Sequence, residues 1–225
     1  MLVSLSSDEV SSYVARQISA FFPDRDVAGA DLRPGVGLAL ERLEFCLDRV
    51  RVKYAAREGQ SNFNHLNTDQ YAVFLYMLSN SLYRELEDVG LAAKTYALNK
   101  ALHAIDVFYE VELPRIFLFQ HPVGTVLGRG RYSDYLMVYQ RCSVGSTLEG
   151  VYPQFGEGVV MFGGSAVIGD CELGANSWLS VGTLVMNARV PANSLVFGKS
   201  PNLVFKPARQ DVKSAMFGAT ASIAV

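Results

Sequence analysis

A six-residue period runs through the second half of the chain and limits what that half can fold into. Between residues 155 and 196 the sequence divides into the consecutive blocks FGEGVV, MFGGSA, VIGDCE, LGANSW, LSVGTL, VMNARV and PANSLV. The same step holds upstream for blocks that begin at residues 126, 132, 138 and 144. A period of six matches neither a strand nor a helix, so it indicates a repeat architecture.

Three such blocks predict one triangular coil, with a short strand and a corner in each block. The apolar first positions are expected to stack inside the coil, and the small fifth positions let the backbone turn past them; these are Phe155, Met161, Val167, Leu173, Leu179 and Val185, and Ser165, Cys171, Ser177 and Thr183. Glycine and asparagine at the corners tolerate left-handed dihedral angles. Residues 150–154, GVYPQ, put the two runs of blocks out of phase and are predicted to form a loop that leaves the coil.

Residues 1–105 have a helical pattern instead. Ser6 and Glu9 form a capping-box pattern before one apolar-periodic stretch, and Asn67 or Thr68 is a plausible N-cap for another that Gly90 would stop. Further helical stretches follow Pro34 and residue 90. EGQSNFNH, between the stretch after Pro34 and the one that Asn67 or Thr68 would cap, is expected to be a loop. We therefore predict an α+β protein with an all-helical domain at 1–105, a parallel β-helix at 106–206 and a tail at 207–225.

Composition restricts the function classes. A formal net charge of −2 gives no electrostatic case for nucleic acid or an anionic membrane as a partner. The longest apolar run, AVFLYML, is too short to span a bilayer, and the N-terminus has no signal-peptide pattern. The three cysteines lack metal-like spacing, so reduced thiols in a cytoplasmic protein are expected, with no metal site.

His121 lies in the stretch FLFQHPVGTVLG, at the entrance to the repeats. A structural histidine is the simplest interpretation of that position, and a catalytic base is the alternative. The chain has only two other histidines. His103 falls on an amphipathic helix and is expected at an interface, and His65 falls in a polar loop.

A family resemblance now bears on these alternatives. The period, together with VPANSLVFGKSPNLVFK at 190–206, resembles the hexapeptide-repeat acyltransferases, whose domains are left-handed parallel β-helices. The helical first half and the stretches HPVGTVLG and VYQRCSVGST are similar to those of serine O-acetyltransferases. The resemblance implies that His121 is the catalytic base and that Asp106, fifteen residues earlier, is its carboxylate partner.

The same resemblance implies acetyl-CoA as co-substrate and a homotrimer, alone or as a dimer of trimers, with CoA between adjacent β-helices. The matched candidates for CoA contacts are Ser146, Thr147, Gly163, Gly164, Val181 and Gly182. Residues 163 and 181 are eighteen positions apart, as one face of a three-sided coil requires.

The expected acceptor follows from departures from the family pattern. Val151 and Tyr152 stand where the family has an Arg-His pair that receives the carboxylate of serine, and Gln120 replaces an aspartate. Without a guanidinium to hold a carboxylate, we predict another hydroxyl acceptor, such as a sugar, a nucleotide sugar or a polysaccharide intermediate. Tyr152, Gln120 and Tyr139 are its candidate contacts. Serine O-acetylation is the alternative, and a catalytically silent β-helix that serves as a binding module is the second alternative.

Overall fold

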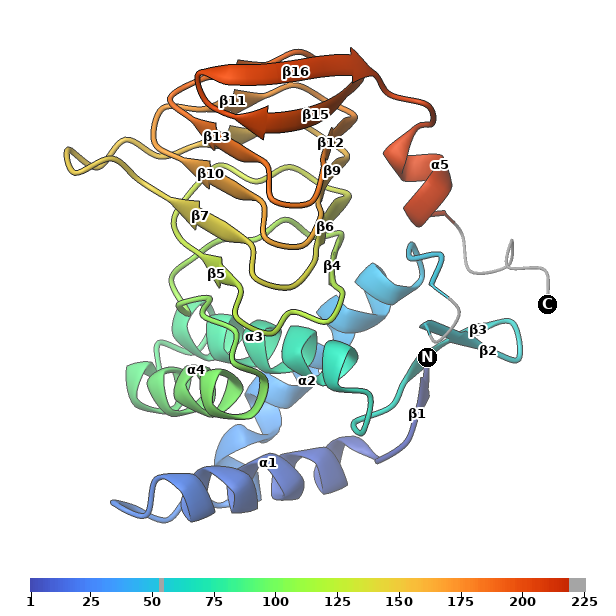
Figure 1. Cartoon of the computed structure of the whole chain (residues 1–225). Helices are drawn as coiled ribbons and strands as arrows, with labels where there is room; N and C mark the ends of the chain where they lie inside the picture. The colour runs from blue at the N-terminus through green and yellow to red at the C-terminus, as the bar shows by residue number, and fades with distance from the viewer. Residues whose placement is uncertain (53–54, 219–225) are drawn as a thin grey trace.

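The computed structural model describes residues 1–52 and 55–218, and it contains a helical part below a parallel β-helix (Figure 1). The helices of the first part are α1 (Ser7–Phe21), α2 (Gly29–Leu47), α3 (Thr68–Arg84) and α4 (Val89–His103). The expected α+β class, with parallel coils after a helical domain, is confirmed.

The helix starts follow the predicted caps. Ser6 and Glu9 form the reciprocal capping box of α1. Asn67 caps α3, because its Oδ1 accepts from the N–H groups of Asp69 at 3.1 Å and Gln70 at 3.2 Å. Helix α3 is the central element of this part: its residues from 69 to 82 are all buried, between α2 and α4 and against the first coil.

Several boundaries differ from the prediction. The strands β1 (Leu2–Val3), β2 (Ala56–Arg57) and β3 (Gln60–Phe63) form a small sheet, so the first part is not all helical. Strands of two residues leave too short a pattern to detect in a sequence. Gly90 does not end α3, which stops at Arg84; it lies in the first turn of α4, where Asp88 caps the helix.

The β-helix has three faces. The first face contains β4 (Phe117–Phe119), β6 (Leu136–Val138), β9 (Val159–Met161), β12 (Ser177–Leu179) and β15 (Ser194–Lys199). The second contains β5 (Val126–Leu127), β7 (Ser143–Gly145), β10 (Ala166–Ile168) and β13 (Leu184–Met186). The third contains β8 (Gln154–Phe155), β11 (Glu172–Leu173) and β14 (Arg189–Val190). All neighbours within a face pair in parallel.

The pairing of the strands follows the predicted six-residue repeat. Val159 pairs with Ser177 and Ala166 with Leu184, each an advance of eighteen residues, or three blocks. Ser143 pairs with Ala166, an advance of twenty-three, so this one coil holds five additional residues. The additional residues lie in the loop between β7 and β8, which projects from the side of the β-helix in Figure 1. The loop predicted at GVYPQ is therefore confirmed, except that Gln154 already lies in β8.

The interior of the coils is the predicted one from residue 155 onward. All six first-position side chains there are at most 3% exposed, and the four small fifth-position residues are buried beside them. The predicted blocks before residue 150 are wrong at their first member, Val126. Its side chain is 44% exposed, and the neighbouring Leu127 is buried instead. Its strand is only two residues long and begins one position out of phase with the blocks that follow.

A hairpin and the tail complete the fold. Strand β16 (Asn202–Pro207) pairs antiparallel with β15 and covers the last coil. The tail then returns along the β-helix to helix α5 (Val212–Met216), where Val212 N–H donates to Asn176 Oδ1 at 3.0 Å. Beyond α5, Phe217 is buried and Gly218 N–H donates to the Arg49 carbonyl at 2.9 Å. The tail is thus bound to both parts of the chain.

Candidate active site

His121 lies at the first corner of the β-helix, directly after β4. Its backbone has φ = +50°, in the left-handed region that few side chains other than asparagine adopt at low cost. Its side chain is 74% exposed, so it is not a buried structural histidine. The corner is fixed from two sides: Gly124 N–H donates to the Ala104 carbonyl at the end of α4, and Arg141 N–H donates to the Val123 carbonyl from the next coil.

The carboxylate next to His121 is Asp69. Asp69 is the second residue of α3 and is only 6% exposed. Its Oδ1 accepts from the backbone N–H of His121 at 3.1 Å, and its Oδ2 lies 3.6 Å from His121 Nδ1. Burial raises the pKa of the Asp69 carboxyl, and the hydrogen bond and charge of His121 oppose that rise. The asparagine cap places this carboxylate, since it fixes where α3 begins.

Gln120 connects the two groups and indicates the tautomer of the imidazole. Its Nε2 donates to Asp69 Oδ2 at 3.1 Å and lies 3.2 Å from His121 Nε2. An amide nitrogen only donates, so Nε2 of the imidazole accepts and Nδ1 carries the proton. That tautomer directs Nδ1–H toward the Asp69 carboxylate, and the basic lone pair of Nε2 accepts the Gln120 amide N–H, which a substrate hydroxyl would have to displace.

Asp106 does not contact His121, which corrects the pairing expected from the sequence. Its Oδ1 accepts from the Tyr96 hydroxyl at 2.7 Å and its Oδ2 from Lys100 Nζ at 2.5 Å. Burial raises the pKa of the Asp106 carboxyl, but these two hydrogen bonds outweigh that effect and leave the pKa lowered. The backbone of Asp106 pairs alongside Val126, so its side chain faces α4.

A pocket of about 300 Å³ opens beside His121, between the first coil and the ends of α3 and α4. Asp69 and His103 line it together with His121. His103 Nδ1 lies 2.7 Å from Asn99 Oδ1, so Nδ1 carries its proton and Nε2 is an acceptor. Burial lowers the pKa of His103 to about 4, which keeps this ring neutral near pH 7.

The lining of this pocket is therefore rich in acceptors, and it contains no arginine or lysine among the described residues. Sequence reasoning missed Asp69 because it lies 52 residues before His121 and reaches it only through the packing of α3 on β4. The capping pattern at Asn67 placed Asp69 at a helix start but carried no signal of its partner.

The predicted CoA contacts divide between two edges of the β-helix. Gly163, Gly164, Val181 and Gly182 lie at corners stacked above that of His121, and Gly182 N–H donates to the Gly163 carbonyl at 3.1 Å. We call this column of corners the His121 edge; it comprises residues 121–124, 139–141, 162–164 and 180–182. Ser146 and Thr147 follow β7 at the other end of the second face.

The backbone gives Gly164 a structural reason of its own, because its φ of +73° lies in the left-handed region. A Cβ on Gly163 would meet only the movable end of the Gln140 side chain, at 2.8 Å from Nε2. Val181, in contrast, is 72% exposed at its corner, an unusual position for a large aliphatic side chain.

The predicted acceptor contacts are also separated. Gln120 lies at His121, as described above. Tyr139 lies on the next corner of the His121 edge, half-buried against Phe162 at a ring distance of 5.1 Å. Tyr152 is 41% exposed on the projecting loop, beyond the second face. One chain alone therefore brings Gln120 and Tyr139 to the same edge as His121 and leaves Tyr152 elsewhere.

The described residues contain no group of three or more histidine, cysteine, aspartate or glutamate side chains placed to hold a metal ion. The cysteines at 46, 142 and 171 are free and buried. Among the helices of residues 1–52 and 55–218, none has the length and apolar character needed to cross a membrane.

The chain is thus a helical part followed by a parallel β-helix of six-residue repeats, with His121 at the first corner. Solved structures place the fold more narrowly, among serine acetyltransferases. The enzyme from Vibrio cholerae superposes with a TM-score of 0.69 at 18% identity, covering 91% of this chain and 81% of that one. The enzyme from Brucella abortus, solved in complex with coenzyme A, gives 0.67 at 18% identity, covering 91% and 83%.

Sequence comparison agrees with the structural one. A serine acetyltransferase of Staphylococcus xylosus is 25% identical over 144 residues. That match covers 62% of this chain and 66% of the relative, just under two thirds of its length. No family model matches the chain.

Proposed function

We propose that this protein is an acetyl-CoA-dependent O-acetyltransferase that uses His121 as a general base. The observation that carries the proposal is an exposed imidazole held beside a buried carboxylate at the first corner of a β-helix, in the fold of enzymes that acetylate a hydroxyl. One of those enzymes was solved with coenzyme A, which supports acetyl-CoA as the donor here.

In the proposed reaction, Nε2 of His121 takes the proton of the acceptor hydroxyl as its oxygen attacks the thioester carbonyl. The new C–O bond forms, the C–S bond breaks, and the imidazolium returns the proton to the leaving thiolate. Asp69 orients the imidazole with Nδ1–H facing its carboxylate and stabilises the imidazolium. A carboxylate has the same role in other histidine–aspartate pairs. Asp106 has a structural role instead, because its hydrogen bonds with Tyr96 and Lys100 join α4 to the first coil.

The acceptor is a small molecule that brings hydrogen-bond donors to the site. Asp69, His103 and His121 offer acceptors for hydroxyl or ammonium groups, and this pocket holds no cation for a carboxylate. This favours a polyhydroxyl acceptor such as a sugar. Serine is the second candidate, favoured by the known relatives, because its ammonium group would suit Asp69.

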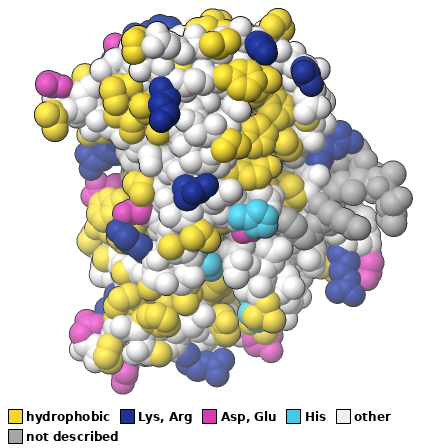
Figure 2. All heavy atoms as spheres, in the orientation of Figure 1, with side chains coloured by type: hydrophobic (Ala, Val, Ile, Leu, Met, Phe, Trp, Pro, Cys, Tyr) yellow, Lys and Arg dark blue, Asp and Glu magenta, His cyan; other side chains and the backbone are white. Residues whose placement is uncertain are grey.

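The working form is proposed to be a homotrimer in the cytoplasm, alone or as a dimer of trimers. The outward side chains of the second face are small or apolar, including Val126 and Met186, whereas those of the third face are Gln154, Glu172 and Arg189. Figure 2 shows hydrophobic side chains gathered over the β-helix. Packing of the second face on a neighbouring copy would bury this surface and form a groove for CoA along the His121 edge.

A thiol-release assay with acetyl-CoA tests the proposal. The purified protein is incubated with acetyl-CoA and, separately, with serine, homoserine, amino sugars and nucleotide sugars. Acceptor-dependent thiol release that is lost in His121→Asn supports the proposal, and turnover with serine alone assigns the second candidate. Absence of CoA binding and of thiol release with every acceptor would leave only the silent binding module.

A further inference from the structure

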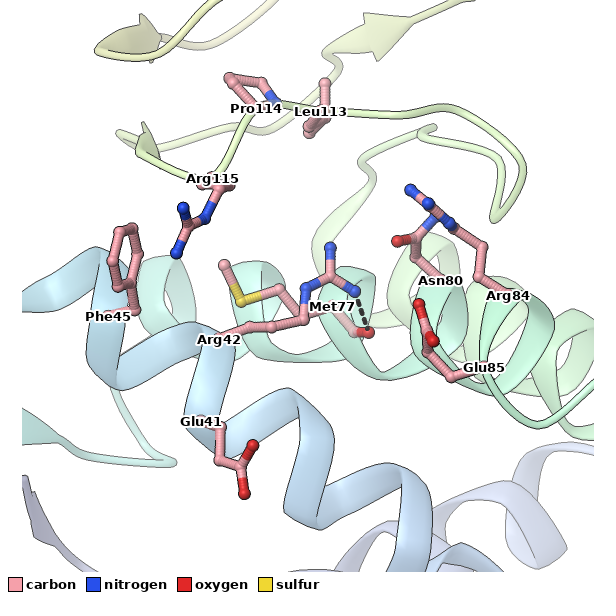
Figure 3. A pocket seen from close by; sticks show the side chains of 10 residues that line it. All are labelled: Glu41, Arg42, Phe45, Met77, Asn80, Arg84, Glu85, Leu113, Pro114 and Arg115. Carbon is pink, nitrogen blue, oxygen red and sulfur yellow. Dashed lines mark hydrogen bonds between the residues drawn. The ribbon is translucent and has the colours of Figure 1, made fainter.

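A second pocket, larger than that at His121, lies at the other end of α3. It has a volume of about 420 Å³ and is enclosed by α2, by the C-terminal half of α3 and by the segment that leads into β4 (Figure 3). Asn80 on its wall is eleven residues beyond Asp69 on the same helix, or about 16 Å along the axis. The two pockets are therefore separate sites.

The charged side chains that line this second pocket are three guanidinium groups from three segments and two exposed carboxylates, Glu41 and Glu85, so cations exceed anions by one. Arg42 comes from α2, Arg84 from the end of α3, and Arg115 from the segment before β4, as Figure 3 shows. Arg84 pairs with the exposed Glu112 at 3.3 Å. Among the described residues, no carboxylate lies within 4.0 Å of the guanidinium of Arg42 or Arg115.

Arg42 is the most deeply placed of the three. It donates through Nη1 to the Met77 carbonyl at 3.2 Å and to Ser81 Oγ at 2.8 Å, both neutral acceptors. Burial lowers the pKa of its guanidinium. A partly buried cation whose hydrogen bonds to Met77 and Ser81 end on neutral groups would be stabilised by an anion in the pocket.

The wall also holds a buried acceptor without a partner. Asn80 is fully buried and donates through Nδ2 to the Tyr109 carbonyl at 2.8 Å. Its Oδ1 has no hydrogen-bond partner among the described residues. Buried amide oxygens are nearly always paired, and this one is covered by the pocket wall in the present conformation, so a ligand donor that reaches it would supply its missing partner.

The aromatic side chain at this pocket, Phe45, already has an arginine guanidinium over its ring faces. Arg49 lies over the ring of Phe45 at 3.7 Å from its centroid, and Arg115 lies over it at 3.9 Å. A nucleobase would find no free ring face on which to stack. The ligand is thus a compact, non-aromatic molecule.

From these contacts we infer that the second pocket binds a small oxyanion that also carries a hydroxyl or amino donor. The anionic group, a carboxylate or a phosphate, binds the guanidinium groups of Arg42, Arg84 and Arg115, and the donor binds Asn80 Oδ1. The inference does not depend on the proposed acetyl transfer, because none of these residues lines the pocket at His121.

Isothermal titration calorimetry with the full chain tests this inference. The probes are glycerol 3-phosphate, malate, succinate, which has no hydroxyl, and glycerol, which has no charge. We expect glycerol 3-phosphate or malate to bind, with malate tighter than succinate, and glycerol not to bind. Binding of the phosphate alone or of malate alone identifies which oxyanion the site takes.

The double variant Arg84→Gln/Arg115→Gln is expected to weaken binding by about tenfold or more, whereas the matched control Arg33→Gln leaves it unchanged. Both pocket arginines are exposed, and Arg33 is an exposed arginine of α2 that pairs with Asp8 outside the pocket. Equal affinity in the double variant would overturn the inference. So would wild-type protein that binds none of the anions up to about 10 mM, or that binds glycerol equally well.

Discussion

The two carboxylates considered for His121 differ in what surrounds them. Asp106 is satisfied by a lysine and a tyrosine of α4, while Asp69 is buried at a helix start with the histidine backbone and a glutamine amide as partners. Asp69 Oδ2 also lies 3.6 Å from Nδ1 of the imidazole, so this carboxylate can orient the ring and favour the tautomer with a proton on Nδ1. A carboxylate that is bonded to Lys100 and Tyr96 cannot do so from its present position.

Replacing His121 by asparagine is expected to lower kcat by about 10²- to 10⁴-fold, the usual contribution of a general base. The fold should persist, because the side chain is mostly exposed and asparagine tolerates the positive φ of this corner. Thiol release and thermal unfolding measured on the same sample check both parts. A variant with unchanged kcat would remove His121 from the mechanism.

The pair Asp69→Asn and Asp106→Asn distinguishes the two carboxylates. Asp69→Asn keeps an acceptor for the His121 N–H but loses the charge that stabilises the imidazolium, so we expect a large fall in kcat with a smaller change in KM. Asp106→Asn should retain most of the activity and cost about 1 kcal/mol of stability, because it weakens the partly exposed contact with Lys100. The reverse pattern of kcat would restore the pairing expected from the sequence.

The lowered pKa of His103 predicts that the stability of the folded chain depends on pH. Its pKa is lowered from 6.5 to about 4 in the folded chain, so between these values the unfolded chain binds a proton that the folded chain does not. The free energy of unfolding therefore falls as pH is lowered from about 6.5 towards 4, by about 2 kcal/mol between pH 7 and pH 5, and this group adds no further loss below 4. Urea unfolding at the two pH values checks it.

The variant His103→Gln supplies the comparison. Glutamine can still donate to Asn99 but does not titrate, so the difference between pH 7 and pH 5 should shrink by the amount attributed to His103. An equal pH dependence in both proteins would show that the loss comes from other groups.

At the scale of elements, the repeats were predictable and the packing between the two parts was not. Between residues 155 and 185 the apolar first positions and the small fifth positions indicate the inside of a coil directly, since each hexad builds its own strand and corner. The phase shift at GVYPQ likewise placed the projecting loop. The neighbour of His121 depends on how α3 packs on β4, and no local pattern in the sequence encodes that contact.

Deleting residues 148–152 would return the enlarged coil to an advance of eighteen residues. The fold should be retained, because Leu148 is fully exposed and the strands on both sides keep their register partners. We expect thermal unfolding within a few degrees of the parent chain and altered selectivity in the acceptor panel, since the loop carries Tyr152. Loss of the cooperative unfolding transition would show instead that the loop supports the coil.

At the scale of the whole molecule, the chain has one pocket near each end of α3, each proposed as a site, and an apolar second face. Met186 is 43% exposed on that face, so Met186→Glu would place a charge where a neighbouring copy is proposed to pack. We expect the variant to sediment as a smaller species than the wild-type protein and to lose thiol release. The matched control Gln154→Glu, on the polar third face, should change neither.

An unchanged sedimentation coefficient for Met186→Glu would exclude the second face from assembly. If the wild-type protein itself sediments as a monomer and still catalyses thiol release from acetyl-CoA, then a single chain forms the whole CoA-binding groove.

The tail that returns to the helical part has a consequence for the order of folding. Arg51 Nη1 donates to the Ser214 carbonyl across 163 residues of sequence, and Val50 pairs with Phe217. Each coil can form on the one before it through contacts about eighteen residues apart, which close early at little entropic cost. The tail contact closes a far longer loop than any coil does, so we expect it to form late, and protection of the Gly218 amide against hydrogen exchange would report its formation.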